Sequence, residues 1–150
     1  MTEAEHIWTA YIDAWNTHGI DAILAAVDEH FIYDERPMTM AAPLVGKAAL
    51  RKYLTGLFKM LPDLQIDTIL CDTGSAVGVA ESVMRGTYFA GFAGLFPKGR
   101  ISARVACVFE VAHGRLMHER LYWDRANTMR QLGVLPAFAS ALAAGPVTFP

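Results

Sequence analysis

The chain has 150 residues, of which 53% are hydrophobic and only 19% are charged, and its formal net charge is -2 at pH 7. A chain of this length can bury a sizeable core without disulfides, and its weak negative charge argues against a nucleic-acid partner. The apolar excess indicates a ligand cavity, a subunit interface or both. We expect one domain over 1–150, with its core at about 7–135 and an apolar tail at 136–150.

Several protein classes are disfavoured by what the sequence lacks. No stretch is long and apolar enough for a membrane-spanning helix, and the acidic start has no signal-peptide pattern. Cys71 and Cys107 each lie in an apolar run, which favours buried free thiols over a disulfide framework. The five histidines show no metal-ligand spacing. We therefore expect a cytoplasmic protein that uses no cofactor and no metal and contacts no membrane.

Helices are predicted mainly in the first part of the chain. Apolar residues at three- and four-residue spacing predict helices at 2–16, 21–30 and 46–60, with a short strand at 31–34. Thr2 is suited to capping the first helix, and Gly19 to ending it in a left-handed conformation. Pro62 lies just beyond the third helix.

Strands dominate the second part of the chain. Four strand-like runs are predicted at 64–71, 76–88, 101–111 and 116–123, with hairpin-type turns at 72–74 and 112–115. Helices followed by consecutive antiparallel strands indicate an α+β domain. We expect a strongly curved antiparallel sheet with the helices packed on its concave face.

Three sequence blocks carry a family resemblance. The first runs through Gly86-Thr87-Tyr88 to Pro97-Lys98-Gly99-Arg100, where a known pattern reads G-T-H-x-G-x-F-x-G-x-x-P-T-G-R. The second is Leu61-Pro62-Asp63-Leu64, and the third is Leu121-Tyr122-Trp123-Asp124 followed by Arg130-Gln131-Leu132-Gly133. In this order the blocks resemble the SnoaL-like polyketide cyclase branch of the NTF2-like (ketosteroid isomerase-like) superfamily, over roughly 7–135.

The resemblance implies an NTF2-like cone with a pocket between the first helix, the third helix and the sheet. It implies a cofactor-independent acid/base enzyme that acts on a hydrophobic, carbonyl-bearing small molecule by intramolecular aldol closure. Two alternatives stay open: another enzyme on the same pocket (an isomerase, a dehydratase or an epoxide hydrolase), and a non-catalytic ligand-binding module. In each case we expect a homodimer formed through the outer face of the sheet.

Asp124 is the first candidate catalytic residue. It follows three bulky residues at the end of the last predicted strand, and burial there would raise a carboxyl pKa towards neutral pH. The resemblance implies that this carboxyl is the acid/base of ring closure. Alternatively, Asp124 only caps a helix from Arg125 to Leu132, which Gly133 would end.

Three further polar side chains share strand parity with Asp124. If no bulge intervenes, His118, Arg120 and Tyr122 lie on the same face of the last strand. We expect this face to line the pocket, with His118 or Arg120 polarising a substrate carbonyl. The alternative is that the opposite polar set, Arg115 and Glu119, faces the pocket.

Two more catalytic candidates come from the ketosteroid isomerases. Tyr11 lies where those enzymes place a tyrosine that donates to the substrate oxygen; alternatively it is plain core. Glu35 lies where they hold a general base; alternatively it is a solvated carboxylate paired with Arg36.

The remaining pocket residues are mostly aromatic. We expect the wall to include Trp15, Tyr33, Phe58, Tyr88, Phe92, Cys107 and Tyr122. Cys107 and Tyr88 depart from the family, which often has an acidic residue or His at the first position and His at the second. The glycines and phenylalanines of 87–97 favour a rim that orders over a ligand.

Overall fold

The computed structural model describes residues 1–36, 42–89 and 98–133. In chain order the elements are α1 (Glu3–Asn16), α2 (Ile20–Ala26), β1 (Val27–Arg36), β2 (Leu44–Val45), α3 (Lys47–Met60), β3 (Gln65–Thr73), β4 (Val77–Tyr88), β5 (Gly99–Ala112), β6 (Arg115–Trp123) and α4 (Arg125–Gln131). The predicted α+β class is confirmed. The expected rim at 87–97 and the tail at 136–150 lie mostly or wholly outside the described residues.

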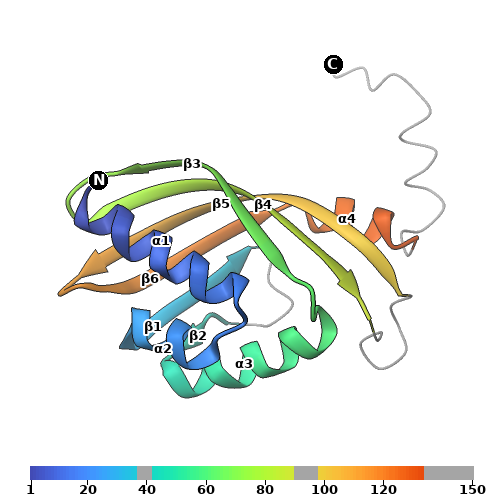
Figure 1. Ribbon diagram of the computed structural model, residues 1–150, viewed down its shortest axis with the longest axis horizontal. Coiled ribbons are helices and arrows are strands. Elements are labelled where there is room, and N and C mark those ends of the chain that lie inside the picture. The colour runs from blue at the N-terminus through green and yellow to red at the C-terminus, as the bar shows by residue number, and fades with distance from the viewer. Residues whose placement is uncertain (37–41, 90–97, 134–150) are drawn as a thin grey trace.

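One curved sheet organises these elements. Its strand order is β2-β1-β6-β5-β4-β3. The sheet arches over α1, α2 and α3, and α4 lies beside β5 at the other end of the sheet (Figure 1). Every neighbouring pair is antiparallel except β1 and β6, which run parallel. The sheet is therefore mixed rather than wholly antiparallel, because β1 lies between β2, its antiparallel neighbour in sequence, and β6, the last strand, to which it runs parallel.

The helix α1 closes the concave face of the sheet. The Thr2 hydroxyl accepts a hydrogen bond from the backbone N–H of Glu5, which confirms the predicted cap. Trp8 then stacks on Phe109 of β5, with 4.4 Å between ring centroids. The Phe109 ring lies where a side chain at Gly78 would be, since a Cβ there would lie 2.2 Å from a ring carbon. This stack requires glycine on β4.

The end of α1 differs from the prediction. His18 has the positive φ of 55°, whereas Gly19 has a φ of -80°. His18 is held in this conformation by two contacts: its Nε2 lies 2.9 Å from the carbonyl oxygen of Leu64, and its ring stacks on Phe58. These tertiary contacts offset the strain of a left-handed histidine.

The first strand starts earlier than the sequence pattern indicates. The helix α2 ends at Ala26, and β1 runs from Val27 to Arg36 rather than over 31–34. Val27 is fully buried and pairs with Leu116 of β6. Pairing with a long strand thus overrides the helical tendency of this segment, and it carries Glu35 to the far end of β1.

The β5–β6 hairpin determines which face each residue of β6 occupies. Its turn residues His113 and Gly114 have φ values of 53° and 73°, as two-residue hairpin turns of type I′ require. The pairing then shifts, because Val111 lies opposite Leu116 but Glu110 lies opposite His118. Met117 is the extra residue of this bulge. It places Leu116 and Glu119 on the same, concave face.

Candidate functional site

The bulge at Met117 reverses the expected orientation of β6. Glu119 is buried on the concave face with an exposed fraction of 4%, while Tyr122 is 47% exposed on the outer face. His118 and Arg120 share the face of Tyr122 because alternate side chains of a strand point in opposite directions. The prediction that the His118 set faces the helices is therefore wrong. The bulge also separates Glu119 from Arg115, which is exposed.

The outer-face residues of β6 form their own polar cluster. Arg120 donates to Glu110 on β5 at 2.5 Å and lies 3.1 Å from Nδ1 of His118. Burial and the neighbouring Arg120 charge lower the pKa of His118. Arg120 therefore interacts with His118 and Glu110, and all three lie on the opposite side of the sheet from Tyr11.

Tyr11 and Glu119 make the central contact of the concave face. Trp8, Tyr11 and Trp15 lie along the buried side of α1, and this spacing brings the Tyr11 hydroxyl to Oε2 of Glu119 at 2.7 Å. Tyr11 has no exposed surface. Burial raises its pKa well above the usual value, and the neighbouring Glu119 carboxyl adds to this effect.

Glu119 is an unusual residue for a protein interior. Burial raises its pKa to about 7, and this outweighs hydrogen bonding by Tyr11 and Cys107, which lowers the pKa. The nearby charge of Glu35 raises it further. A carboxyl with such a pKa gains and loses its proton near neutral pH and is mostly protonated below it. Burial likewise raises the pKa of the Cys107 thiol, which lies beside Glu119.

Glu35 is the second carboxyl of the concave face. Its Oε2 accepts from the Tyr53 hydroxyl of α3 and its Oε1 accepts from the Trp123 indole of β6, each at 3.0 Å. The expected alternative, a pair with Arg36, is wrong, since Arg36 binds Asp34 on the outer face at 2.9 Å. The sheet and α3 thus fix both oxygens of Glu35.

Tyr33 lies between the two carboxyl groups. Its ring centroid is 5.4 Å from that of Tyr53, and only 3% of its surface is exposed. Burial raises its pKa well above normal, and the charges of both Glu35 and Glu119 contribute. The two carboxyls are therefore coupled across one group of phenols, which we call the concave-face network: Tyr11, Tyr33, Glu35, Tyr53, Cys107, Glu119 and Trp123.

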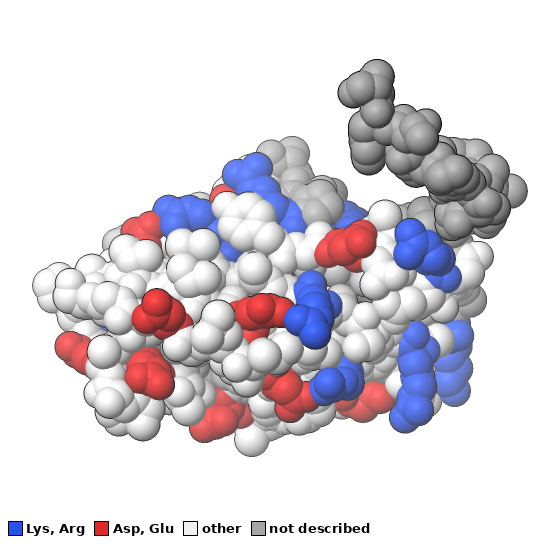
Figure 2. All heavy atoms as spheres, turned by 90° about the horizontal axis from the view of Figure 1, so that it is seen from above, with Lys and Arg blue, Asp and Glu red and all other residues white. Residues whose placement is uncertain are grey.

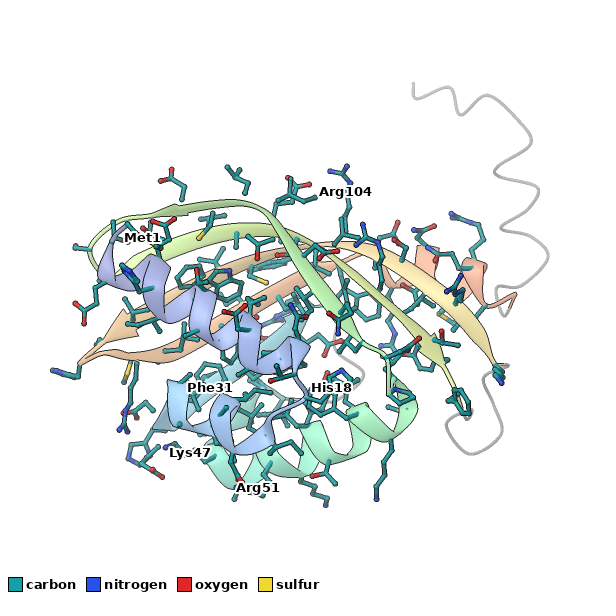
Figure 3. The ribbon with its side chains drawn as sticks, in the orientation of Figure 1. Met1, His18, Phe31, Lys47, Arg51 and Arg104 are labelled. Carbon is teal, nitrogen blue, oxygen red and sulfur yellow. The ribbon has the colours of Figure 1, made fainter. Side chains whose placement is uncertain are left out.

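The other predicted wall residues surround this network. Trp15 packs edge-on against Tyr11 and Phe58, with centroids 6.1 and 5.7 Å apart. Tyr88 lies on the concave side of β4, where burial and then the Glu35 charge raise its pKa. Figure 3 shows Phe31, which packs on Tyr11, on the helix side of the sheet, and Arg104 pointing away from it. Phe92 lies outside the described residues.

The enclosed pocket stays a prediction. Two hollows of about 470 and 460 Å³ open beside α4, and Arg104 and Asp124 border both of them. Neither is lined by Tyr11 or Glu119. Tyr122 borders the second hollow, so it belongs to the outer surface rather than to the wall of the concave face.

Asp124 has a defined structural role. Its Oδ1 accepts a hydrogen bond from the backbone N–H of Asn127 at 2.9 Å, which confirms the predicted cap of α4. Gly133, with a φ of 70°, ends the helix as expected. The side chain is exposed, and none of the hydrogen bonds of Glu35 or Glu119 involves it. Its catalytic role stays a prediction.

Sequence reasoning missed three members of the site. Tyr53 lies among the apolar residues of the predicted third helix, and Trp123 lies between Tyr122 and Asp124, so neither stands out as a partner for a carboxylate. Glu119 was named only in the alternative set with Arg115, because both faces of the last strand carry polar residues.

Within 1–36, 42–89 and 98–133, no three His, Cys, Asp or Glu residues are grouped so as to hold a metal ion. Across those same ranges, no helix is both long and apolar enough to cross a bilayer. The cytoplasmic location stays a prediction.

Known structures share this fold at low sequence identity. A proposed polyketide cyclase from Xanthomonas campestris pv. campestris is 21% identical, with a TM-score of 0.78 over 87% of this chain and 96% of that one. An LEH-like epoxide hydrolase from M. tuberculosis is 17% identical, with a TM-score of 0.70 over 95% and 97%. A Catenulispora acidiphila protein with a ketosteroid isomerase-like fold, in complex with trimethylamine, is 16% identical, with a TM-score of 0.73 over 88% and 95%.

Sequence comparison gives the more specific result. Among curated proteins, none matches the chain. The pattern of the SnoaL-like polyketide cyclases, in contrast, matches residues 5–132. This range includes both carboxyls of the concave face and, apart from the first two residues of α1, every helix and strand from α1 to α4. The chain therefore belongs to the SnoaL-like polyketide cyclase family.

Proposed function

We propose that this protein is a cofactor-independent acid/base enzyme that enolises a hydrophobic carbonyl compound and closes a ring by aldol addition. The observation that carries the proposal is the Glu35 carboxylate, held on the concave face by Tyr53 and Trp123 at 3.0 Å each. A half-buried carboxylate with both oxygens fixed by neutral donors is suited to accepting a proton from carbon.

In this mechanism Glu35 removes a proton from the carbon next to a substrate carbonyl. The electrons of the C–H bond form a carbon–carbon double bond, and the carbonyl π electrons move to oxygen. Tyr11, the second candidate from the sequence, donates a hydrogen bond to that oxygen. The enolate carbon then attacks a second carbonyl of the same molecule and forms the ring bond. The new alkoxide takes up a proton.

The surroundings support an apolar substrate. Trp15, Phe58 and Tyr33 present aromatic rings on the same face as the two carboxyls. Such walls can hold a flexible chain folded, and the proximity of its two carbonyls then contributes much of the rate. Membership of the SnoaL-like family supports the ring-closing form of the reaction.

A direct assay does not need the natural substrate. We would incubate the protein with 2-tetralone, a hydrophobic ketone, in D₂O and follow the loss of its α-proton signals by NMR. We expect exchange well above the buffer rate. Binding of 2-tetralone without faster exchange would favour the alternative hypothesis of a non-catalytic ligand-binding module.

The epoxide hydrolase alternative is less well supported. It would need paired carboxylates around an arginine and a water, and Glu35, Arg120 and Asp124 are the residues that would have to supply these groups. Arg120 instead binds Glu110 on the outer face, and Asp124 caps α4. The similarity to the M. tuberculosis enzyme therefore supports a common fold without a common set of reacting groups.

We also propose that two copies associate through the outer face of the sheet. Leu70, Val77, Val79 and Tyr122 are each about half exposed there, at 58%, 49%, 48% and 47%. Figure 2 views the molecule from above and shows uncharged surface between scattered charged side chains, with Lys and Arg gathering towards the end where α4 lies. A partner would bury this apolar surface.

A further inference from the structure

We propose that Glu119 is a positioning residue that stores a proton for Tyr11 and keeps that phenol able to donate to the substrate oxygen. This inference rests on the proposed function, because it assigns a role only to a residue behind the enolising site. Glu119 itself would not touch the substrate. It would act through Tyr11, the residue it contacts.

The geometry places the two groups in direct contact. Glu119 Oε2 accepts from the Tyr11 hydroxyl across 2.7 Å, between a strand residue that is 4% exposed and a helix residue with no exposed surface. When a substrate oxygen arrives, the Tyr11 proton can turn towards it. The protonated oxygen of Glu119 can then donate back to the phenol oxygen. Only hydrogen positions need change.

The groups that face Glu119 favour a neutral acid. They are Tyr11 from α1, Cys107 from β5, and Tyr33 and Glu35 from β1. None of these is a cation, and Glu119 makes no ion pair within the described ranges. A buried carboxyl without a cationic partner and beside a second carboxylate keeps its proton. Burial accordingly raises its pKa to about 7.

The position of Glu119 also bears on why residue 107 can be a cysteine. The resemblance implies an acidic residue or His there in many relatives, whereas a thiol is a weak donor. Glu119 is on the next strand and lies diagonally across from Cys107, since Phe109 faces Glu119 and Cys107 faces Leu121. The carboxylic acid missing from β5 is therefore present on β6, with Cys107 as its neighbour.

The protons balance over the enolisation step. The α C–H bond breaks and its proton goes to the Glu35 carboxylate. The enolate oxygen takes the Tyr11 proton, and Tyr11 takes the Glu119 proton, which leaves Glu119 as a carboxylate. When the ring bond forms, the enol O–H bond breaks and its proton returns through Tyr11 to Glu119, while the new alkoxide takes the proton held by Glu35.

The test compares Glu119→Gln with Glu110→Gln, a matched variant on the outer face that removes the partner of Arg120. In the 2-tetralone exchange assay, we expect the wild-type rate to fall as the pH rises through about 7, the pKa of Glu119. Glu119→Gln should lower the rate roughly 10²-fold and remove this alkaline decline. Glu110→Gln should retain both the rate and the decline.

A second readout does not depend on activity. The Glu119 resonance in protein carrying ¹³C-labelled glutamate carboxyls is identified by its loss in Glu119→Gln. It should titrate near pH 7. Tyr11→Phe should raise this midpoint, because the Tyr11 hydrogen bond favours the charged form. A midpoint near the ordinary 4.5 would overturn the inference.

The outcomes separate this inference from the proposed function. If Glu35→Gln abolishes exchange but Glu119→Gln retains the wild-type rate and alkaline decline, the positioning role is wrong and the enolising function stands. If Glu35→Gln exchanges at the wild-type rate, Glu35 is not the base and the proposed function fails, whatever the state of Glu119.

Discussion

Trp123 donates its indole N–H to Oε1 of Glu35 across 3.0 Å, which joins the end of β6 to the end of β1. The parallel pairing of these strands places Glu35 opposite Leu121, so that the indole two residues later reaches the carboxylate. This hydrogen bond orients the Glu35 carboxylate, which we propose as the base.

Replacing Trp123 with Phe removes that donor and retains an aromatic ring. With one oxygen freed, the Glu35 carboxylate loses its fixed orientation, and we expect 2-tetralone exchange to fall roughly tenfold or more. The free energy of unfolding should fall by about 1–2 kcal/mol, from one lost hydrogen bond and a smaller ring. An unchanged exchange rate in a folded Trp123→Phe protein would show that this orientation is unimportant.

The raised pKa of Glu119 predicts a pH-dependent stability. The unfolded carboxyl loses its proton near pH 4.5, whereas the folded carboxyl keeps it until about pH 7. Between these values the folded state binds more protons, so this contribution is full below pH 4.5 and lost as the pH rises through about 7. In the wild-type protein, Glu119 should make the free energy of unfolding fall by up to about 1.4 kcal/mol per pH unit in this window. In Glu119→Gln this part of the pH dependence should be absent. Urea unfolding at a series of pH values measures both curves, and parallel curves would contradict the prediction.

Asp124 offers a test that separates a cap from a catalyst. Asn caps helices about as well as Asp, so Asp124→Asn should leave both stability and exchange close to wild type. Asp124→Ala should cost about 1 kcal/mol of stability. If Asp124→Asn instead loses 10²–10⁴ in rate with its stability intact, the role implied by the family resemblance is correct and Glu35 is not the sole acid/base.

Two glycines provide a matched pair for the core. An alanine at Gly78 would place its Cβ 2.2 Å from the Phe109 ring, and we expect a loss of about 1–3 kcal/mol or more. Gly56 lies within α3 with nothing within 4 Å of the corresponding position. Gly56→Ala should therefore stabilise the protein by about 0.5–1 kcal/mol. Thermal unfolding of both variants measures this contrast, and a stable Gly78→Ala protein would exclude the tight stack.

The proposed dimer is tested on its apolar surface. Val79→Asp places a charge among the exposed side chains of the outer face, and light scattering should show a shift from dimer to monomer at micromolar concentration. Val45 is 61% exposed on β2, at the opposite edge of the sheet from β3 and β4, so Val45→Asp is the control and should not change the mass. A monomeric wild-type protein would refute the proposal.

Local signals in the sequence predicted much of the fold. Thr2, Asp124 and Gly133 cap helices where expected, and the His113-Gly114 turn joins the last two strands. These features depend on a few neighbouring residues. His18 shows where such reasoning fails, because its left-handed backbone is held by Leu64 and Phe58, which are distant in sequence.

The candidate site was harder to predict than the fold. Tyr11 and Glu35 were found through the family resemblance, and the structure places both on the concave face. Glu119 was given only as the alternative because both faces of the predicted strand carry polar residues, and its grouping with Arg115 did not allow for the bulge at Met117. One extra residue in a strand moves every later side chain to the other face of the sheet. Which residues of the strand are buried therefore cannot be predicted from alternation alone.

The central claim is that Glu35 is the base, and Glu35→Gln tests it most directly. The amide retains size and can still bond Tyr53 or Trp123, but it cannot accept the α-proton. Glu29 on the same strand, where it binds Lys47 at 2.9 Å, provides the control variant Glu29→Gln. We predict that Glu35→Gln loses 10²–10⁴ of the 2-tetralone exchange rate, with wild-type stability and an unchanged Glu29→Gln rate. Exchange by Glu35→Gln within twofold of wild type would contradict the account.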